Sequence, residues 1–151
     1  AFRTLEFNCR FGDPEAQVVL PLLETDLAAV MEACVEGRLD EVELRWSPKS
    51  CVCVVMASGG YPGSYERGYE IEGLEEASRL PDTVIFHAGT RREGGRILTA
   101  GGRVLGVTAW GEGLPQAVRK AYTAVDLIHW PNVMFRRDIG AKGLQAAKEE
   151  A

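Results

Sequence analysis

The sequence predicts an α+β protein with a small, mostly antiparallel sheet and flanking helices. From residue 50 onward, short apolar runs are separated by glycine-rich turns, which is typical of strands. Over residues 114–128, apolar side chains recur at helical spacing instead. Between these strands and the N-terminal part lies a polar stretch, and its change of composition predicts a boundary near residues 38–48.

The first predicted element is a half-buried strand over residues 4–10. Apolar and polar residues alternate there, so that Glu6, Asn8 and Arg10 share one face. The polar side chains of this face therefore converge on one side of the chain.

Two helices are expected next. In GDPEAQ, Asp13 suits an N-cap, Pro14 the first helical position and Glu15 the first turn, while Pro21 limits this helix to a short piece. A second helix is predicted from Thr25 to a C-cap at Gly37. Its apolar residues at helical spacing are Leu27, Val30, Met31, Cys34 and Val35.

The remaining elements follow from the apolar runs and the glycines. Strands are predicted in SCVCVVMAS, TVIFHAG, GRILTA and GRVLGVTAWG, with a short one in VMF and a loop in GGYPGSYERG. Gly101 and Gly102 lie between two strand-like runs, which predicts a hairpin. The helix over 114–128 packs on the sheet, and a turn at Gly140 leads to a frayed, charged tail over 145–151.

Composition and charge exclude several classes of protein. A net charge of -5 and scattered basic residues give no electrostatic footprint for nucleic acid. The longest apolar runs are too short to cross a bilayer, so no membrane role is expected. The four cysteines have no histidine at zinc-ligand spacing and are expected to be reduced thiols in the cytoplasm. A start without methionine or a signal peptide suggests a piece of a longer chain.

The polar face of residues 4–10 allows two interpretations. A solvated sheet surface is the commoner use of such a face. The alternative is a metal site, because Glu6 and Asn8, about 6–7 Å apart along a strand, present the hard oxygens that Mg²⁺ prefers. Arg10 follows in the same row, where a planar cation suits an oxyanion beside the metal. This order of groups favours phosphoryl transfer.

Several motifs together resemble one enzyme family. EFNCR resembles the last catalytic strand of the ATP-grasp ligases, whose Glu-x-Asn-x-Arg row holds the metal ions that bridge the ATP phosphates. EFNCRFGDPEAQVVLPLLETDL, VVMASGGYPGSYERG, FHAGT, GGRVLGVTAWG and FRRDIGAKGL then resemble, in the same order, the C-terminal part of the phosphoribosylamine-glycine ligases of purine biosynthesis. The resemblance extends from about Leu5 to Leu144.

The resemblance implies an ATP-dependent ligase in which glycine is activated as an acyl phosphate and attacked by 5-phosphoribosylamine. Glu6 and Asn8 carry over as Mg²⁺ or Mn²⁺ ligands, and Arg10 as a contact to the phosphoryl or carboxylate group. Gly12, Asp13 and Pro14 match a segment of the substrate pocket, although the N-cap role remains the simpler account of Asp13. The substrates are then ATP, glycine and 5-phosphoribosylamine.

The same resemblance implies that this chain is incomplete as an enzyme. Residues 1–45 correspond to the end of an ATP-grasp core, and residues 46–144 to the ligase's C-terminal domain, which is barrel-sandwich-like in the family. The nucleotide clamp and the phosphate-binding lysines belong to an N-terminal part that is missing here and against which this chain is expected to pack. The chain alone is therefore expected to be inactive. Another ATP-grasp ligase or carboxylase, or a noncatalytic α+β binding domain, remains the alternative.

Overall fold

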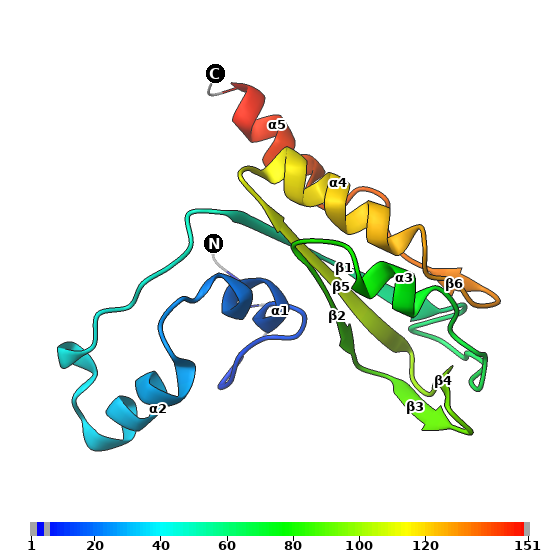
Figure 1. Ribbon diagram of the computed structural model, residues 1–151, viewed down its shortest axis with the longest axis horizontal. Helices are drawn as coiled ribbons and strands as arrows, with labels where there is room; N and C mark the ends of the chain where they lie inside the picture. The colour runs from blue at the N-terminus through cyan, green and yellow to red at the C-terminus, as the bar shows by residue number, and fades with distance from the viewer. Residues whose placement is uncertain (1–2, 5–6, 150–151) are drawn as a thin grey trace.

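The computed structural model describes residues 3–4 and 7–149 and confirms the predicted α+β class. The helices and strands follow in the order α1 (Ala16–Val19), α2 (Leu27–Glu36), β1 (Ser50–Ser58), α3 (Leu74–Ser78), β2 (Thr83–His87), β3 (Thr90–Glu93), β4 (Arg96–Thr99), β5 (Arg103–Gly111), α4 (Leu114–Val125), β6 (Val133–Met134) and α5 (Ala141–Glu149). Two 3-10 helices, η1 (Leu20–Leu22) and η2 (Leu39–Glu41), flank α2. Figure 1 shows α4 along one face of the main sheet and α1 on the other side.

Four antiparallel strands form the main sheet in the order β2-β5-β1-β6. The two central strands, β1 and β5, pair along their whole length, with Ser50 opposite Gly111 and Val54 opposite Val107. The register shifts between Met56 and Ala57, because β5 carries one extra residue, Val104, at that point. The bounds predicted for β1 are confirmed.

The hydrophobic core lies between this sheet and α4. Because side chains alternate along a strand, Val52, Val54 and Met56 of β1 all point into it and are buried. The predicted amphipathic helix is confirmed, although α4 ends at Val125. The buried residues of α4 are Ala117, Ala121, Ala124 and Val125. Its small alanines let the helix approach the sheet closely.

The predicted hairpin at Gly101 and Gly102 is wrong. β4 pairs with β3 in a separate two-stranded sheet, whereas β5 pairs with β1 and β2. The hairpin turn is made by Gly94 and Gly95, which have φ angles of 57° and 81°. A two-residue type I′ turn requires positive φ at both positions, so this glycine pair is the one that closes a hairpin.

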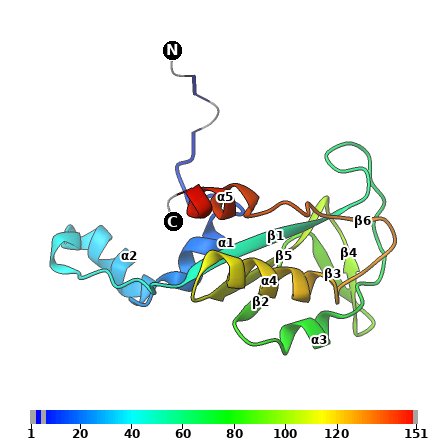
Figure 2. The same cartoon turned by 90° about the horizontal axis from the view of Figure 1, so that it is seen from above.

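The second predicted helix is present, with Asp26 rather than Thr25 as its N-cap. Asp26 Oδ1 accepts a hydrogen bond from the Ala28 amide at 2.8 Å, and Gly37 adopts the left-handed conformation at the C-cap. Thr25 Oγ1 instead accepts a hydrogen bond from the Arg45 amide at 2.7 Å. This bond ties the helix to the segment that leads into β1. Figure 2 shows α2 well away from the main sheet.

The tail predicted to fray is helical in the structure, because α5 runs to Glu149. Its alanine, lysine, leucine and glutamine residues are strong helix formers, and this preference was overlooked beside the charged lysine and glutamate residues. The segment before α5 is fastened by Tyr122 of α4, whose hydroxyl donates to the Arg136 carbonyl at 2.7 Å and accepts the Ile139 amide at 3.1 Å.

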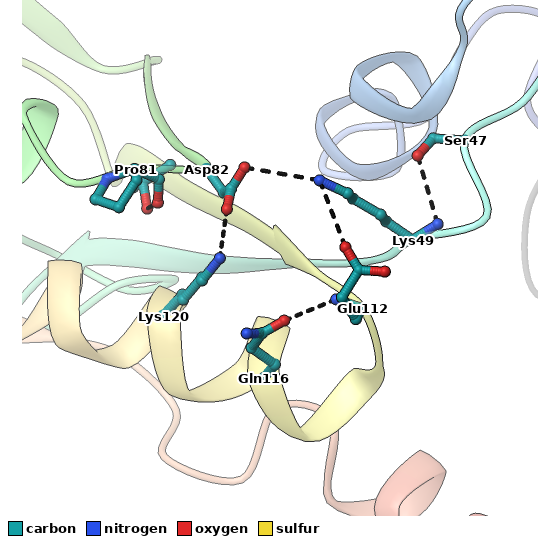
Figure 3. Close-up of polar contacts among 8 residues, drawn as sticks. Ser47, Lys49, Pro81, Asp82, Glu112, Gln116 and Lys120 are labelled. Carbon is teal, nitrogen blue, oxygen red and sulfur yellow. Dashed lines mark hydrogen bonds and ion pairs between the residues drawn. The ribbon is translucent and has the colours of Figure 1, made fainter.

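A network of charges closes the end of the sheet where β1 begins (Figure 3). Asp82, in the turn before β2, forms an ion pair with Lys120 of α4 and lies 3.9 Å from Lys49 Nζ. Lys49 Nζ also lies 3.7 Å from a Glu112 carboxylate oxygen. The network therefore joins the chain entering β1, the turn before β2, the end of β5 and α4.

Candidate functional site

The predicted row of polar residues is only partly described by the structure. Glu6 lies outside the described residues, while Asn8 and Arg10 are exposed. The described residues of the predicted strand over 4–10 form no strand, and this N-terminal stretch leads away from the sheet (Figure 2). An extended segment becomes a strand only beside a partner strand, and the two sheets found among the described residues are built from later residues.

The chemistry of Asn8 and Arg10 still fits the predicted roles. Asn8 supplies an amide oxygen, a ligand type that suits Mg²⁺ or Mn²⁺. Arg10 Nη1 donates to the Phe11 carbonyl at 2.8 Å, which leaves a guanidinium with further donors on an exposed side chain. In the part of the chain that the structure describes, no three His, Cys, Asp or Glu side chains gather to hold a metal. A complete site therefore needs oxygens beyond Asn8.

Asp13 is not the N-cap of the first helix, which corrects the prediction. The helix begins later, at Ala16, after an N-cap position at Glu15 that makes no side-chain cap bond, so Pro14 lies in the preceding turn. The Asp13 carboxylate instead accepts Gln17 Nε2 at Oδ1 and Arg103 Nη2 at Oδ2, both at 2.9 Å. These partners replace the helix amides that an N-cap would bind.

A small cavity of about 30 Å³ lies between this turn and the sheet. Asp13, Pro14 and Gln17 line one side of it, and the other side includes His87 and Arg103. Gln17 Oε1 is buried there without a hydrogen-bond partner among the described atoms. A cavity of this size has room for one water molecule. His87 Nδ1 lies 3.1 Å from Thr90 Oγ1, as expected for a structural histidine.

Two of the cysteines lie on the same sheet face as this cavity. Burial raises the pKa of the Cys51 thiol to about 11, and the neighbouring Cys53 adds to the shift. Burial also raises the pKa of Cys53. Both side chains are therefore neutral thiols at physiological pH and suit the role of small, weakly polar side chains.

The other motifs surround two wider openings. The GGYPGSYERG loop and the residues before β6 line a hollow of about 620 Å³, to which Tyr65, Glu66 and Asn132 contribute. A groove of about 730 Å³ runs beside β1 and includes Arg136 and Arg137. Arg136 is engaged by Asp138 through two hydrogen bonds of 2.8 and 2.6 Å, and Arg137 lies 3.3 Å from Asp126.

Sequence reasoning missed the contact between Asp13 and Arg103. The two residues are 90 positions apart, and no local period or motif links them. The only sequence signal is that both belong to segments already compared with the ligases, FGDPEAQ and GGRVLG.

An antiparallel sheet covered by one long helix defines this part of the chain as an α+β domain. The family model described as Phosphoribosylglycinamide synthetase, C domain, matches residues 51–142. The chain therefore belongs to this family. That result disfavours a carboxylase or an unrelated binding domain.

Relatives of known name agree with this assignment. The chain is 54% identical over 143 residues to the phosphoribosylamine–glycine ligase of Synechocystis sp., covering 94% of this chain and 34% of that protein. It is 52% identical over 154 residues to the chloroplastic phosphoribosylamine–glycine ligase of Arabidopsis thaliana, covering 98% and 29%. The crystal structure of the Thermotoga maritima phosphoribosylamine–glycine ligase matches with a TM-score of 0.66 at 34% identity, covering 89% of this chain and 32% of that one. The chain thus spans about a third of these relatives.

Proposed function

We propose that this chain is the C-terminal part of an ATP-dependent ligase that joins glycine to 5-phosphoribosylamine in purine biosynthesis. The products are glycinamide ribonucleotide, ADP and phosphate, formed through a glycyl phosphate. The observation that carries the proposal is the 54% identity across 94% of the chain to a protein named for this reaction. A cytoplasmic enzyme is the setting we propose. In the described residues no helix has the length and apolar character needed to span a membrane.

In this proposal the N-terminal segment supplies part of the active site. Glu6 and Asn8 hold Mg²⁺ or Mn²⁺ through their oxygens, and Arg10 binds the phosphoryl or carboxylate group. The bound cation would neutralise charge on the phosphoryl oxygens of ATP. The guanidinium of Arg10 adds fixed donors at the same oxygens, where preorganised charge is most effective. Gly12 and Pro14 shape the substrate pocket beside it.

We further propose that the rest of the ligase covers the N-terminal segment of this chain. Large apolar side chains are exposed along residues 7–46, including Phe7 and Val35, which are 86% and 89% exposed. The predicted apolar stripe of α2 is largely uncovered, since Met31 is also half exposed. Apolar surface of this kind marks a contact surface. The two thirds of the relatives that this chain does not span would supply the partner.

The proposal is tested by comparing the chain with its parent enzyme. The parent should release phosphate from ATP only when glycine and 5-phosphoribosylamine are both present, and the purified chain of 151 residues should release none above background. In the parent, Glu6→Ala and Asn8→Ala should each lower kcat/KM by about 100-fold or more, in line with the loss of transition-state charge stabilisation. Glu76→Ala, an exposed substitution on α3, is the matched control.

Two outcomes would contradict the proposal. Phosphate release by the parent that does not depend on glycine would exclude this reaction. Full activity of both the Glu6→Ala and Asn8→Ala variants would show instead that the polar row is an ordinary surface.

A further inference from the structure

Arg103, at the start of β5, binds two oxygens of Asp13 through its guanidinium group. Its Nη1 donates to the Asp13 carbonyl and its Nη2 to the Asp13 carboxylate, each at 2.9 Å. A planar guanidinium that grips a main-chain and a side-chain oxygen of one residue fixes both the position and the direction of that residue. The sheet thereby determines where the turn before α1 lies.

We propose that Arg103 is a positioning residue of the ligase, an inference that rests on the proposed function. It holds the turn of residues 12–14, and through it Arg10 and Asn8, in the geometry that the reaction needs. Arg103 itself touches neither substrate nor metal in this proposal. Its effect reaches the active site only through Asp13.

The contacts of Asp13 support an anchoring role rather than a substrate contact. Gln17 Nε2 occupies its second carboxylate oxygen, so both oxygens are engaged within the chain. A second tie runs parallel to the first, because Thr108 Oγ1 of β5 donates to the Gln17 carbonyl at 3.1 Å. Two points of the same short segment are thus fixed to one strand.

We call the contact between Arg103 and Asp13 the clamp, and its Arg103 end lies in a paired part of the sheet. The Arg103 carbonyl accepts the Gly89 amide at 2.9 Å, and Arg103 lies opposite Ala57, where the register of β1 and β5 shifts. Asp13 is only three residues beyond Arg10, so a shift of the turn is passed along a short tether. Misplacement of a reacting group by about 1 Å can cost about 100-fold in rate.

The same clamp should matter little for folding. The Arg103 and Asp13 side chains are 40% and 49% exposed, and exposed ion pairs add little to stability. Removing the clamp should therefore lower activity while leaving stability nearly unchanged. Loss of a purely structural contact would lower activity only through lost stability.

The test uses the full-length parent enzyme with Arg103→Gln, Arg103→Lys and Asp13→Asn. Arg103→Gln should lower kcat/KM by about 10- to 100-fold while the melting temperature stays close to that of the wild type. Arg103→Lys keeps a cation that can reach one of the two oxygens and should recover part of the loss. The double variant Arg103→Gln/Asp13→Asn should be no worse than the more damaged single variant, since both remove one interaction.

Arg91→Gln is the matched control, because Arg91 pairs with Glu93 at 3.1 Å within the β3–β4 hairpin. If Arg103→Gln is as active as this control, the inference is wrong. It is also wrong if lost activity follows the fraction of unfolded enzyme, with kcat and KM unchanged per folded molecule. If the wild-type parent enzyme does not join glycine to 5-phosphoribosylamine, the proposed function is wrong, and the inference falls with it.

Discussion

Asp82 accepts a charged hydrogen bond from Lys120, which fastens the turn before β2 to α4 across 38 residues of sequence. The two side chains are 33% and 26% exposed, so this pair is among the better protected ion pairs of the molecule. It lies at the end of the sheet where β1 begins, and it stabilises the packing of α4 against the strands.

The first prediction concerns the pH dependence of this contact. The hydrogen bond from Lys120 holds the pKa of Asp82 below its ordinary value of 3.8. A carboxyl group with a lowered folded-state pKa contributes stability above its unfolded pKa, and this is lost as pH falls through the folded value. Asp82→Asn should therefore lower the melting temperature at pH 7, and the difference from wild type should shrink below about pH 4.

Thermal unfolding of both proteins between pH 7 and pH 2 measures this effect. Glu93→Gln, which removes a charge from a more exposed ion pair, should change the melting temperature less. Identical curves for Asp82→Asn and wild type at pH 7 would contradict the prediction.

The second prediction compares two glycines with nearly the same φ angle. Gly73 and Gly95 have φ angles of 79° and 81°, but a Cβ at Gly73 would lie 1.8 Å from the Leu127 carbonyl oxygen, whereas Gly95 faces open space. Gly95→Ala should cost about 1–2 kcal/mol for left-handed backbone alone. Gly73→Ala should cost about 3–5 kcal/mol because the backbone must also move.

Chemical denaturation of the two variants gives these costs directly. Equal losses would show that the chain at Leu127 yields easily and that the close approach is unimportant.

The third prediction separates core methionine from surface methionine. Met56 is fully buried between the sheet and α4, while Met31 of α2 is 50% exposed. In the chain of 151 residues, Met56→Ala should cost about 2–5 kcal/mol of unfolding free energy and Met31→Ala less than about 0.5 kcal/mol. In the parent enzyme, Met31→Ala should cost more unfolding free energy than it does in the chain of 151 residues, because the proposed partner surface covers Met31 there. A neutral Met31→Ala in both contexts argues against that surface.

The fourth prediction concerns thiol reactivity. Cys9 and Cys34 are exposed, whereas Cys51 and Cys53 are partly buried with raised pKa values. Only the thiolate is nucleophilic, so iodoacetamide at pH 8 should label Cys9 and Cys34 first. Labelling of Cys51 should accelerate as pH approaches 11. Mass spectrometry of digested samples locates the label, and rapid labelling of Cys51 at pH 8 would contradict the structure.

Local patterns were sufficient for the central strands and the long helix. β1 is an apolar run bounded by polar residues, and α4 repeats apolar residues over three turns, so each carries its own signal. The family could likewise be inferred from several short motifs in the correct order, because each motif consists of consecutive residues and can be recognised without knowing the fold.

Contacts between distant segments could not be predicted in this way. The glycine pairs at 94–95 and 101–102 satisfy the same local rule, and only the partner of β4 distinguishes them. Asp13 suits an N-cap by composition, but a guanidinium 90 residues away competes for its carboxylate. The metal roles of Glu6 and Asn8 stay predictions, since they depend on oxygens that a 10-residue stretch cannot supply.

The pairing of β1 with β5 also has a consequence for biosynthesis. β5 ends at Gly111, 53 residues after the end of β1, so the most apolar strand leaves the ribosome long before its main partner. At roughly 5–20 residues per second, this delay lasts a few seconds. During that interval CVCVVMA is an unpaired, uncharged β-forming segment, the kind that aggregates. Until β5 is made, this segment would need a chaperone or a folded N-terminal segment to cover it.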